Sequence, residues 1–331
     1  MRVLLDHSNP FLLGHGGLQI QIEQTHHALR QADVGVEYCR WWDDTQQADI
    51  IHYFGRPSVA YVNLAQRKGI RVVMSQLLTG LGSRSAWLLP LQRTAIAVAR
   101  KGLPKIITSQ YAWDVYQKVD AAVALTAWEG HLMSYMFGAL EKKVHVVPNG
   151  VEEVFFRSEK ATRGQWLVCT ATVTERKRVL ELAEAAVLAK TPLWVIGKPY
   201  SDSDPYAERF VALARANTEM IRYEGAISDR AQLARIYHEA RGFVLLSTME
   251  SLSLSALEAA ACECPLLLSD LPWARTTFKD DARYCLIASR SRTAPVLRQF
   301  YDEAPKLKPP PKPPTWAEVA QQFKRLYENL M

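Results

Sequence analysis

Two glutamates stand eight residues apart at the start of an expected helix. Glu250 and Glu258 follow the apolar run 243–246, which is typical of a buried strand, and residues 253–262 have helical character. At 1.5 Å per residue, a helix would place the two carboxylates about 12 Å apart. That separation approximates the span from a hexose, across a diphosphate, to a ribose. One carboxylate could accept sugar hydroxyls and the other ribose hydroxyls, although two glutamates on a solvated helix face would show the same spacing.

The residues around the first glutamate suit a phosphate group. Ser251 and Ser253 are residue types that favour a helix start. The free backbone N–H groups of a first helical turn, together with the helix dipole, attract an anion. The sequence therefore predicts an anion site just ahead of this helix.

A run of cations follows another apolar strand, 166–170. Arg176, Lys177 and Arg178 are consecutive, and positive charges at the carboxyl end of a strand could neutralise a diphosphate leaving group. Cations beside a helix N-terminus are unfavourable unless an anion binds there, which favours a functional interpretation over a solvated helix start. A third candidate is the turn containing Gly16 and Gly17, where a ligand could approach the backbone closely. This turn is not GxGxxG, so a nicotinamide cofactor is not indicated.

Alternating strands and helices must position these residues. Short, almost wholly apolar runs alternate with amphipathic ones, which indicates α/β domains with parallel, doubly wound sheets covered on both faces. The polar stretch 157–164 interrupts the pattern, which then restarts. We therefore expect two Rossmann-like domains, 1–156 and 165–304, with ligands beyond the carboxyl ends of their strands. The expected strands are 2–5, 34–39, 49–53, 71–74, 121–125 and 144–147, then 166–170, 193–196, 221–223, 243–246 and 266–268.

The C-terminal part differs from the rest. Residues 305–314 contain six prolines, which predicts a stiff, extended linker. Residues 316–330 show apolar side chains at three- or four-residue spacing, as an amphipathic helix would. A spacer of about ten residues at roughly 3.1 Å each could carry this helix some 30 Å. We therefore expect 315–331 to complete the first domain.

Composition limits the class of protein. The chain has 331 residues, of which 48% are apolar and 22% charged, an ordinary globular balance that excludes a disordered or fibrous chain. The net charge of +6 is far from that of a dedicated nucleic-acid binder, so no nucleic-acid partner is expected. Five scattered cysteines argue against a disulfide framework, and no apolar run reaches about 18 residues. We therefore expect a cytoplasmic protein, with the inner membrane face as an alternative place of contact.

Taken together, these segments resemble the family-four glycosyltransferases, which are retaining enzymes with the GT-B fold, also called glycosyltransferases group 1. The flanked Glu-x7-Glu segment is the most specific part, and the motifs follow the family's order over nearly the whole chain. They are Gly16-Gly17-Leu18, Val147-Pro148-Asn149-Gly150-Val151, Arg176-Lys177, Tyr223-Glu224-Gly225-Ala226-Ile227, and Glu250-x7-Glu258 continuing through Ala261 to Cys264-Pro265.

The resemblance implies two domains facing a central cleft and a retaining, metal-independent hexosyl transfer without a cofactor. The donor would be a UDP-, GDP- or ADP-type nucleotide sugar bound mainly by the second domain. The acceptor would be a glycan, lipid-linked or small-molecule hydroxyl at the first domain. Glu250, Arg176 and Lys177 would be catalytic, Glu250 contacting the sugar and the two cations the departing phosphate. The implied donor-binding residues are Gly16, Gly17, Thr172, Gly225, Ile227, Ser251, Leu252, Ser253, Leu254 and, at the ribose, Glu258.

The chain departs from the family's pattern at three places. Thr172 stands where many members carry an arginine, and Ser251 and Ser253 replace common glycines. Many members have a cleft histidine where this chain reads 75–77 as Ser-Gln-Leu. His7 could then contact the acceptor or the sugar, or it could simply cap or pack.

Other interpretations remain open. A nucleotide-sugar epimerase shares this architecture, and the unmatched histidine leaves a non-catalytic sugar-nucleotide or glycan-binding protein as a further alternative. Asp202 and Asp204 form a DxD pattern, but a helix cap and turn explain it better than a metal site. The basic, apolar segment 84–105 could make weak peripheral contact with an anionic membrane or could be an ordinary surface helix.

Overall fold

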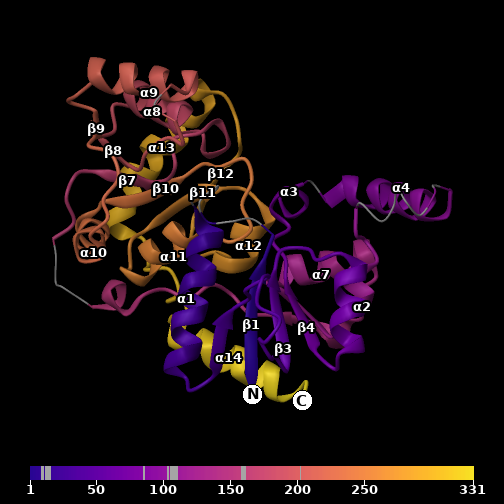
Figure 1. Ribbon diagram of the computed structural model, residues 1–331. Helices are drawn as coiled ribbons and strands as arrows, with labels where there is room; N and C mark the ends of the chain where they lie inside the picture. The colour runs from indigo at the N-terminus through magenta and orange to yellow at the C-terminus, as the bar shows by residue number, and fades with distance from the viewer. Residues whose placement is uncertain are drawn as a thin grey trace. The chain divides into compact units, whose positions relative to one another are not determined.

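The computed structural model of the chain describes residues 1–8, 11, 16–84, 86–102, 104, 111–157, 162–201 and 203–331. Its contacts divide the chain into two compact α/β domains (Figure 1). The first comprises Met1–Gly150 and Pro314–Met331, and the second comprises Val151–Pro313. Each is built on a six-stranded parallel sheet, which confirms the predicted fold class of two Rossmann-like domains.

The first sheet has the strand order β2-β1-β3-β4-β5-β6. Its central strands are apolar and buried because helices cover both faces, and this is why they read as continuous apolar runs in the sequence. All six strands were expected, and their ends differ from the expected ones by no more than two residues. The bounds are β1 Arg2–His7, β2 Gly35–Tyr38, β3 Ile50–Phe54, β4 Arg71–Ser75, β5 Ala121–Ala124 and β6 Val144–Val146.

Helices α2 and α7 of the first domain begin where a hydroxyl side chain accepts a backbone N–H group. The Ser58 hydroxyl accepts from Tyr61 N at the start of α2, and the Thr126 hydroxyl accepts from Glu129 N at the start of α7. The bounds are α1 Gly17–Gln31, α2 Val59–Arg67, α3 Thr79–Gly82, α4 Leu89–Gly102, α6 Val115–Lys118, α7 Ala127–Phe137 and α14 Trp316–Glu328.

Helix α14 lies on the first domain, far in sequence from the rest of it. Thr315 and Glu318 form a capping box, in which each side chain accepts a backbone N–H of the other residue. The helix packs along α1, and the Lys324 ammonium donates to the Ala32 carbonyl at 3.0 Å. Its buried side chains, Trp316, Val319, Phe323, Leu326 and Tyr327 among them, repeat with the expected helical spacing.

A buried polar chain fastens α14 to the sheet. His52 of β3 lies between the Tyr327 hydroxyl, 2.6 Å from Nδ1, and the Ser75 hydroxyl, 2.7 Å from Nε2. Burial lowers the pKa of His52 to about 3, so the ring is neutral and one nitrogen donates while the other accepts. Both ring nitrogens are therefore satisfied in a site that excludes water.

The second sheet has the order β12-β11-β10-β7-β8-β9. The edge strand β12 and the helices α12 and α13 were not expected. Strand β12 is short and carries an exposed arginine, and Pro295 lies inside α13, so neither shows a clear apolar period. The strands are β7 Leu167–Thr170, β8 Leu193–Ile196, β9 Ile221–Tyr223, β10 Gly242–Leu245, β11 Leu266–Ser269 and β12 Arg283–Cys285. The helices are α8 Val179–Ala189, α9 Pro205–Ala216, α10 Arg230–Glu239, α11 Leu254–Ala261, α12 Pro272–Phe278 and α13 Arg290–Glu303.

The contacts place the domain boundary at residue 150 rather than at the expected residue 156. Phe155 is buried in the second domain, where its carbonyl accepts from the Cys262 thiol at 3.3 Å. The proline-rich segment also makes contacts there up to Pro313, including an ion pair of 3.1 Å between Lys312 and Glu263. Apolar and ionic contacts of this kind are not visible in local composition. Within the described residues, no helix is both long enough and apolar enough to cross a membrane.

We predict that Tyr327→Phe destabilises the first domain by about 1–3 kcal/mol, because it leaves one nitrogen of the buried His52 ring without a partner. Urea unfolding followed by fluorescence measures this loss. Tyr200→Phe is the matched control, since Tyr200 is exposed and should change stability by less than about 0.5 kcal/mol. Equal stability of the two variants would mean that the His52 chain contributes nothing to holding α14.

Candidate active site

The second sheet has a topological switch point between β7 and β10. From β7 the chain continues to β8 on one side, whereas from β10 it continues to β11 on the other. Beyond the carboxyl ends of such neighbouring strands the following loops diverge and leave room for a ligand. Here a backbone hydrogen bond of 2.8 Å from Thr248 N to the Arg176 carbonyl joins the two loops. The loops that carry the predicted cations and the predicted glutamate therefore lie side by side.

The carboxylate of Glu250 binds both predicted cations. Its Oε1 atom accepts from Arg176 Nη1 at 3.2 Å and from the Lys177 ammonium, and Arg176 Nη1 also donates to the Met249 carbonyl at 2.8 Å. The Glu250 and Lys177 side chains are 10% and 12% exposed, whereas Arg176 is 37% exposed. The three residues expected to be catalytic are thus together, with one positive charge in excess of the carboxylate.

A strained turn presents these cations. Residues Glu175–Lys177 form a single 3-10 turn, and Arg178 then adopts a left-handed conformation with φ of 54° before α8 begins. Such a conformation costs energy for a residue with a Cβ, and it occurs preferentially at functional sites. The third cation of the run does not join the cluster: the Arg178 guanidinium donates to the Ala288 carbonyl at 2.5 Å. The cluster on Glu250 therefore contains two of the three consecutive cations, Arg176 and Lys177.

Helix α11 begins beside this cluster in the sequence. Ser253 is its N-cap and accepts from Ala256 N at 3.4 Å, as the serine pattern predicted. Ser251, Leu252 and Ser253 are buried, and Leu254 is the first helical residue, four residues after Glu250. The backbone amides of this segment thus lie at the helix end that favours an anion, as expected from the sequence.

Glu258 lies within α11 and is bound by residues that the sequence analysis did not identify. Arg230 donates to Glu258 Oε1 and, at 2.8 Å, to Glu152, while its guanidinium lies over the Phe155 ring. The Tyr237 hydroxyl lies 3.5 Å from Glu258 Oε2. A buried glutamate among alanines in α11 signals that a cation must be near, but not which one.

Burial and neighbouring charges shift the pKa values of Glu258 and Arg230 in opposite directions. Burial raises the pKa of Glu258, and the Arg230 guanidinium lowers it only in part. Burial lowers the pKa of Arg230, but its two carboxylate partners raise it more. Arg230 therefore keeps a carboxylate available that burial alone would tend to protonate.

Two glycines, Gly197 and Gly225, lie just beyond the carboxyl ends of β8 and β9. Gly197 N donates to the Gly225 carbonyl at 2.9 Å, and a Cβ on Gly197 would lie 1.9 Å from the Ala171 carbonyl oxygen. Gly225 has φ of 84°, and no described atom lies within 4 Å of where its Cβ would be. The sequence analysis identified Gly225 but missed Gly197. Thr172 and Ile227 are half-buried in the neighbouring loops.

The remaining predicted residues belong to the first domain. Gly16 has φ of 152° and precedes α1, which begins at Gly17. The His7 ring, at the end of β1, stacks on Phe11 with ring centroids 4.5 Å apart. The neighbouring residue, Asp6, was not predicted: it is buried and accepts from Trp41 Nε1 at 3.0 Å and from the Tyr61 hydroxyl at 2.5 Å. The residues 14 and 15 of the same turn lie outside the described residues.

In the part of the chain that the structure describes, no three His, Cys, Asp or Glu side chains gather as metal ligands would. Asp204 of the DxD pattern caps α9 by accepting from Tyr206 N at 2.9 Å. Asp202 lies outside the described residues.

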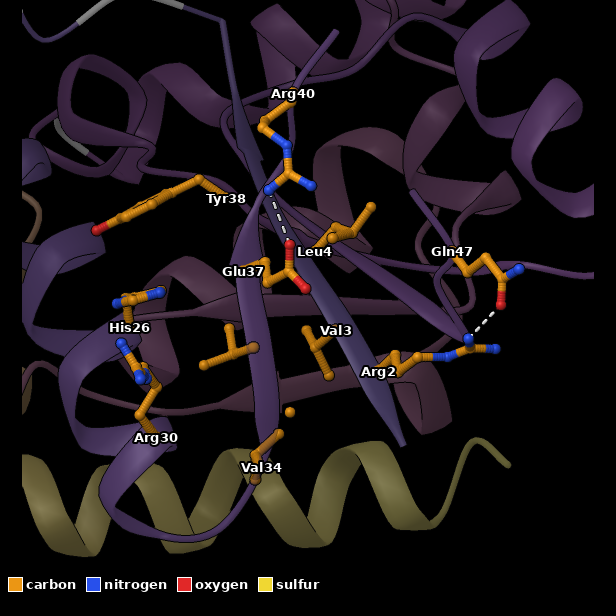
Figure 2. A pocket seen from close by; sticks show the side chains of 12 residues that line it. Arg2, Val3, Leu4, His26, Arg30, Val34, Glu37, Tyr38, Arg40 and Gln47 are labelled. Carbon is orange, nitrogen blue, oxygen red and sulfur yellow. Dashed lines mark hydrogen bonds and ion pairs between the residues drawn. The ribbon is translucent and has the colours of Figure 1, made fainter. Parts of the chain in front are cut away.

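Two surface cavities add little to this site. One of about 640 Å³ borders the edge strand β2, and in its lining Arg40 pairs with Glu37 and Arg2 with Gln47 (Figure 2). None of the predicted site residues lines it. The other, of about 540 Å³, borders β9 and includes Gly225 at its rim.

We predict that Arg230→Gln destabilises the second domain by about 1–3 kcal/mol at about pH 8 and by less at about pH 5. Loss of the guanidinium raises the pKa of Glu258 further, so the buried carboxyl must be charged at high pH but takes up a proton as the pH falls. Urea unfolding of the variant and the wild type at both pH values measures the difference. The double variant Arg230→Gln/Glu258→Gln should remove the pH dependence of that difference; a loss that is equal at both pH values would contradict the explanation.

The chain is similar to known proteins in part of its sequence and in its fold. Residues 151–298 match the family model of glycosyl transferases group 1. No curated protein matches the chain in sequence. Sucrose-phosphate synthase from Thermosynechococcus elongatus is similar in structure over 100% of this chain and 99% of its own, with a TM-score of 0.69 and 14% identity. HepE from Anabaena, solved in complex with UDP, is similar over 99% of this chain and 100% of its own, with a TM-score of 0.66 and 12% identity.

A glycosyltransferase from Rickettsia africae is similar over 99% of this chain and 98% of its own, with a TM-score of 0.65 and 12% identity. These likenesses concern the fold, whereas the sequence match falls within the second domain, where the cations, both glutamates and Gly225 lie. The resemblance inferred from the motifs is thereby confirmed. The chain has the GT-B fold, and residues 151–298 of its second domain match the group 1 glycosyl transferase family.

Proposed function

We propose that this protein is a retaining hexosyltransferase that moves a sugar from a nucleotide-sugar donor to a hydroxyl group of a glycan, lipid-linked or small-molecule acceptor. The observation that supports the proposal is the convergence of Arg176, Lys177 and Glu250 at the switch point of the second sheet. Two cations and a helix N-terminus next to one carboxylate suit a ligand that carries a diphosphate at one end and sugar hydroxyls at the other.

In the proposed complex the donor diphosphate takes the place of Glu250 as the main partner of the two cations. Arg176 and Lys177 then stabilise the negative charge that develops on the departing phosphate, which is the contribution of preorganised cations in such a site. Glu250, released from part of its ion pairing, accepts hydroxyls of the donor sugar. Because two side-chain cations supply the charge, the proposal includes no metal and no other cofactor.

Groups next to the Glu250 cluster would bind the nucleoside part of the donor. We propose that Glu258 accepts ribose hydroxyls while Arg230 holds it as a positioning residue. The base would contact the backbone at Gly225 and Ile227, where the absence of a Cβ on Gly225 leaves open space. HepE has been solved with UDP and with UDP-glucose, so UDP-type donors are the first to test, followed by GDP- and ADP-type donors.

Donor binding and slow hydrolysis test the proposal without a known acceptor. UDP, GDP, ADP and their glucose conjugates are compared for stabilisation in thermal unfolding, since a ligand that binds the folded state raises its stability. Nuclear magnetic resonance then follows the sugar released to water, whose first-formed anomer should match that of the donor. Activity should persist in the presence of a chelator.

Other outcomes of that experiment would replace the proposal. A C2 epimer formed without acceptor would identify a nucleotide-sugar epimerase. Binding without any turnover, with water or with a panel of sugar and alcohol acceptors, would identify a non-catalytic binding protein. Inversion at the anomeric carbon would refute the retaining mechanism.

We predict that Lys177→Ala lowers kcat by roughly 10²–10³-fold, as the loss of one preorganised donor to a developing charge does. The melting temperature should stay within about 2 °C of the wild type because Arg176 still balances Glu250. Steady-state release of the nucleoside diphosphate measures the effect. Lys308→Ala, which removes an exposed cation elsewhere in the same domain, is the control and should retain full activity. An unchanged kcat in Lys177→Ala would remove this residue from the mechanism.

A further inference from the structure

The positive charge of the chain is concentrated in one stretch of the first domain. Residues 50–113 contain nine Lys and Arg and no Asp or Glu, whereas the rest of the chain carries 31 Lys and Arg against 34 Asp and Glu. The overall charge of +6 therefore comes from this stretch alone. Helix α4, Leu89–Gly102, lies within it.

One face of α4 is packed on its own domain. Leu89 and Ile96 are buried, and the Arg93 guanidinium lies over the Tyr135 ring at 4.5 Å. On the same face Arg100 donates to the Phe137 carbonyl at 3.3 Å. The spacing of these residues by three or four positions defines an inner face that contacts α7.

The opposite face of α4 is apolar and uncovered by the described residues. Leu91 and Val98 are 66% and 64% exposed, and with Thr94, Ala95, Ala99 and Gly102 they line a shallow groove of about 710 Å³. Trp87, just before the helix, is 71% exposed. Figure 1 shows α4 projecting from the first domain.

The flanks of this face are cationic. Arg84 and Lys101 are exposed before and at the end of the helix, and no acidic residue lies between them. An apolar helix face bordered by Trp and by Lys or Arg is the composition that places a helix in the headgroup region of a bilayer. Two copies of the chain would instead bring these like charges together, which disfavours self-association through this face.

We propose that α4 and Trp87 dock this protein on an anionic phospholipid surface, with Leu91 and Val98 inserted among the headgroups and Arg84 and Lys101 beside the lipid phosphates. The proposal is independent of the transfer activity, because membrane binding requires no donor. It would give the first domain access to acceptors that are themselves held in a membrane.

Sedimentation with vesicles tests this docking. Wild-type protein should sediment with vesicles of phosphatidylcholine and phosphatidylglycerol but much less with phosphatidylcholine alone, and added salt should weaken the binding. Leu91→Gln/Val98→Gln should lower the partition coefficient on anionic vesicles by about tenfold or more. Lys101→Glu should lower it by roughly fivefold or more, because it replaces an attracted charge by a repelled one.

Leu188→Gln is the matched control, since Leu188 is 57% exposed on α8 of the second domain and should leave vesicle binding unchanged. Circular dichroism of each variant shows whether it is folded. The proposal is overturned if the wild type fails to bind anionic vesicles, or if Leu91→Gln/Val98→Gln, while folded, binds them as the wild type does. It is also overturned if light scattering shows a wild-type dimer that Leu91→Gln/Val98→Gln abolishes while vesicle binding is absent. Donor hydrolysis measured on the same variants separates a failure of docking from a failure of the proposed function.

Discussion

The ion pairing of Glu250 with Lys177 and Arg176 joins two loops that are more than seventy residues apart in the chain. The pairing is available only because β7 and β10 are neighbours at the point where the strand order reverses. Parallel strands end at the same edge, so the loop after β7 and the loop after β10 meet there. Three features keep these ion pairs in place. They are the strained turn before α8, the N-cap of α11 and the hydrogen bond from Thr248 N to the Arg176 carbonyl.

A second ion pair, between Glu258 and Arg230, shows that the two glutamates have different charged surroundings. Both carboxylates are buried, but Glu250 has a surplus of positive charge around it, which suits exchange of partners with an incoming anion. Glu258 instead shares Arg230 with Glu152, and these ion pairs hold the carboxylate in place.

The positions of the strands could be predicted from the sequence, whereas most long-range contacts between side chains could not. Strands such as β4 and β10 are apolar because both of their faces are covered, and this local signal survives in the sequence. Glu250 and Lys177 were found for a related reason, since each lies in the loop that follows such a strand, whereas Gly225 was named only through the family resemblance. Arg230 and Gly197 were missed because their roles depend on contacts with segments far along the chain. The left-handed conformation of Arg178 likewise has no residue signature, because glycine, the usual one, is absent there.

The return of α14 to the first domain has a consequence for biosynthesis. Residues 1–150 emerge from the ribosome long before residues 316–328, so the nascent first domain lacks the helix that packs on α1 and covers His52. The second domain is contiguous and is fully synthesised before α14 appears. During synthesis the N-terminal domain usually folds first. Here the core of the first domain can be completed only after the whole second domain has been synthesised. Until α14 has been synthesised and packed, the surface of α1 that it covers stays exposed, and a chaperone could shield this surface.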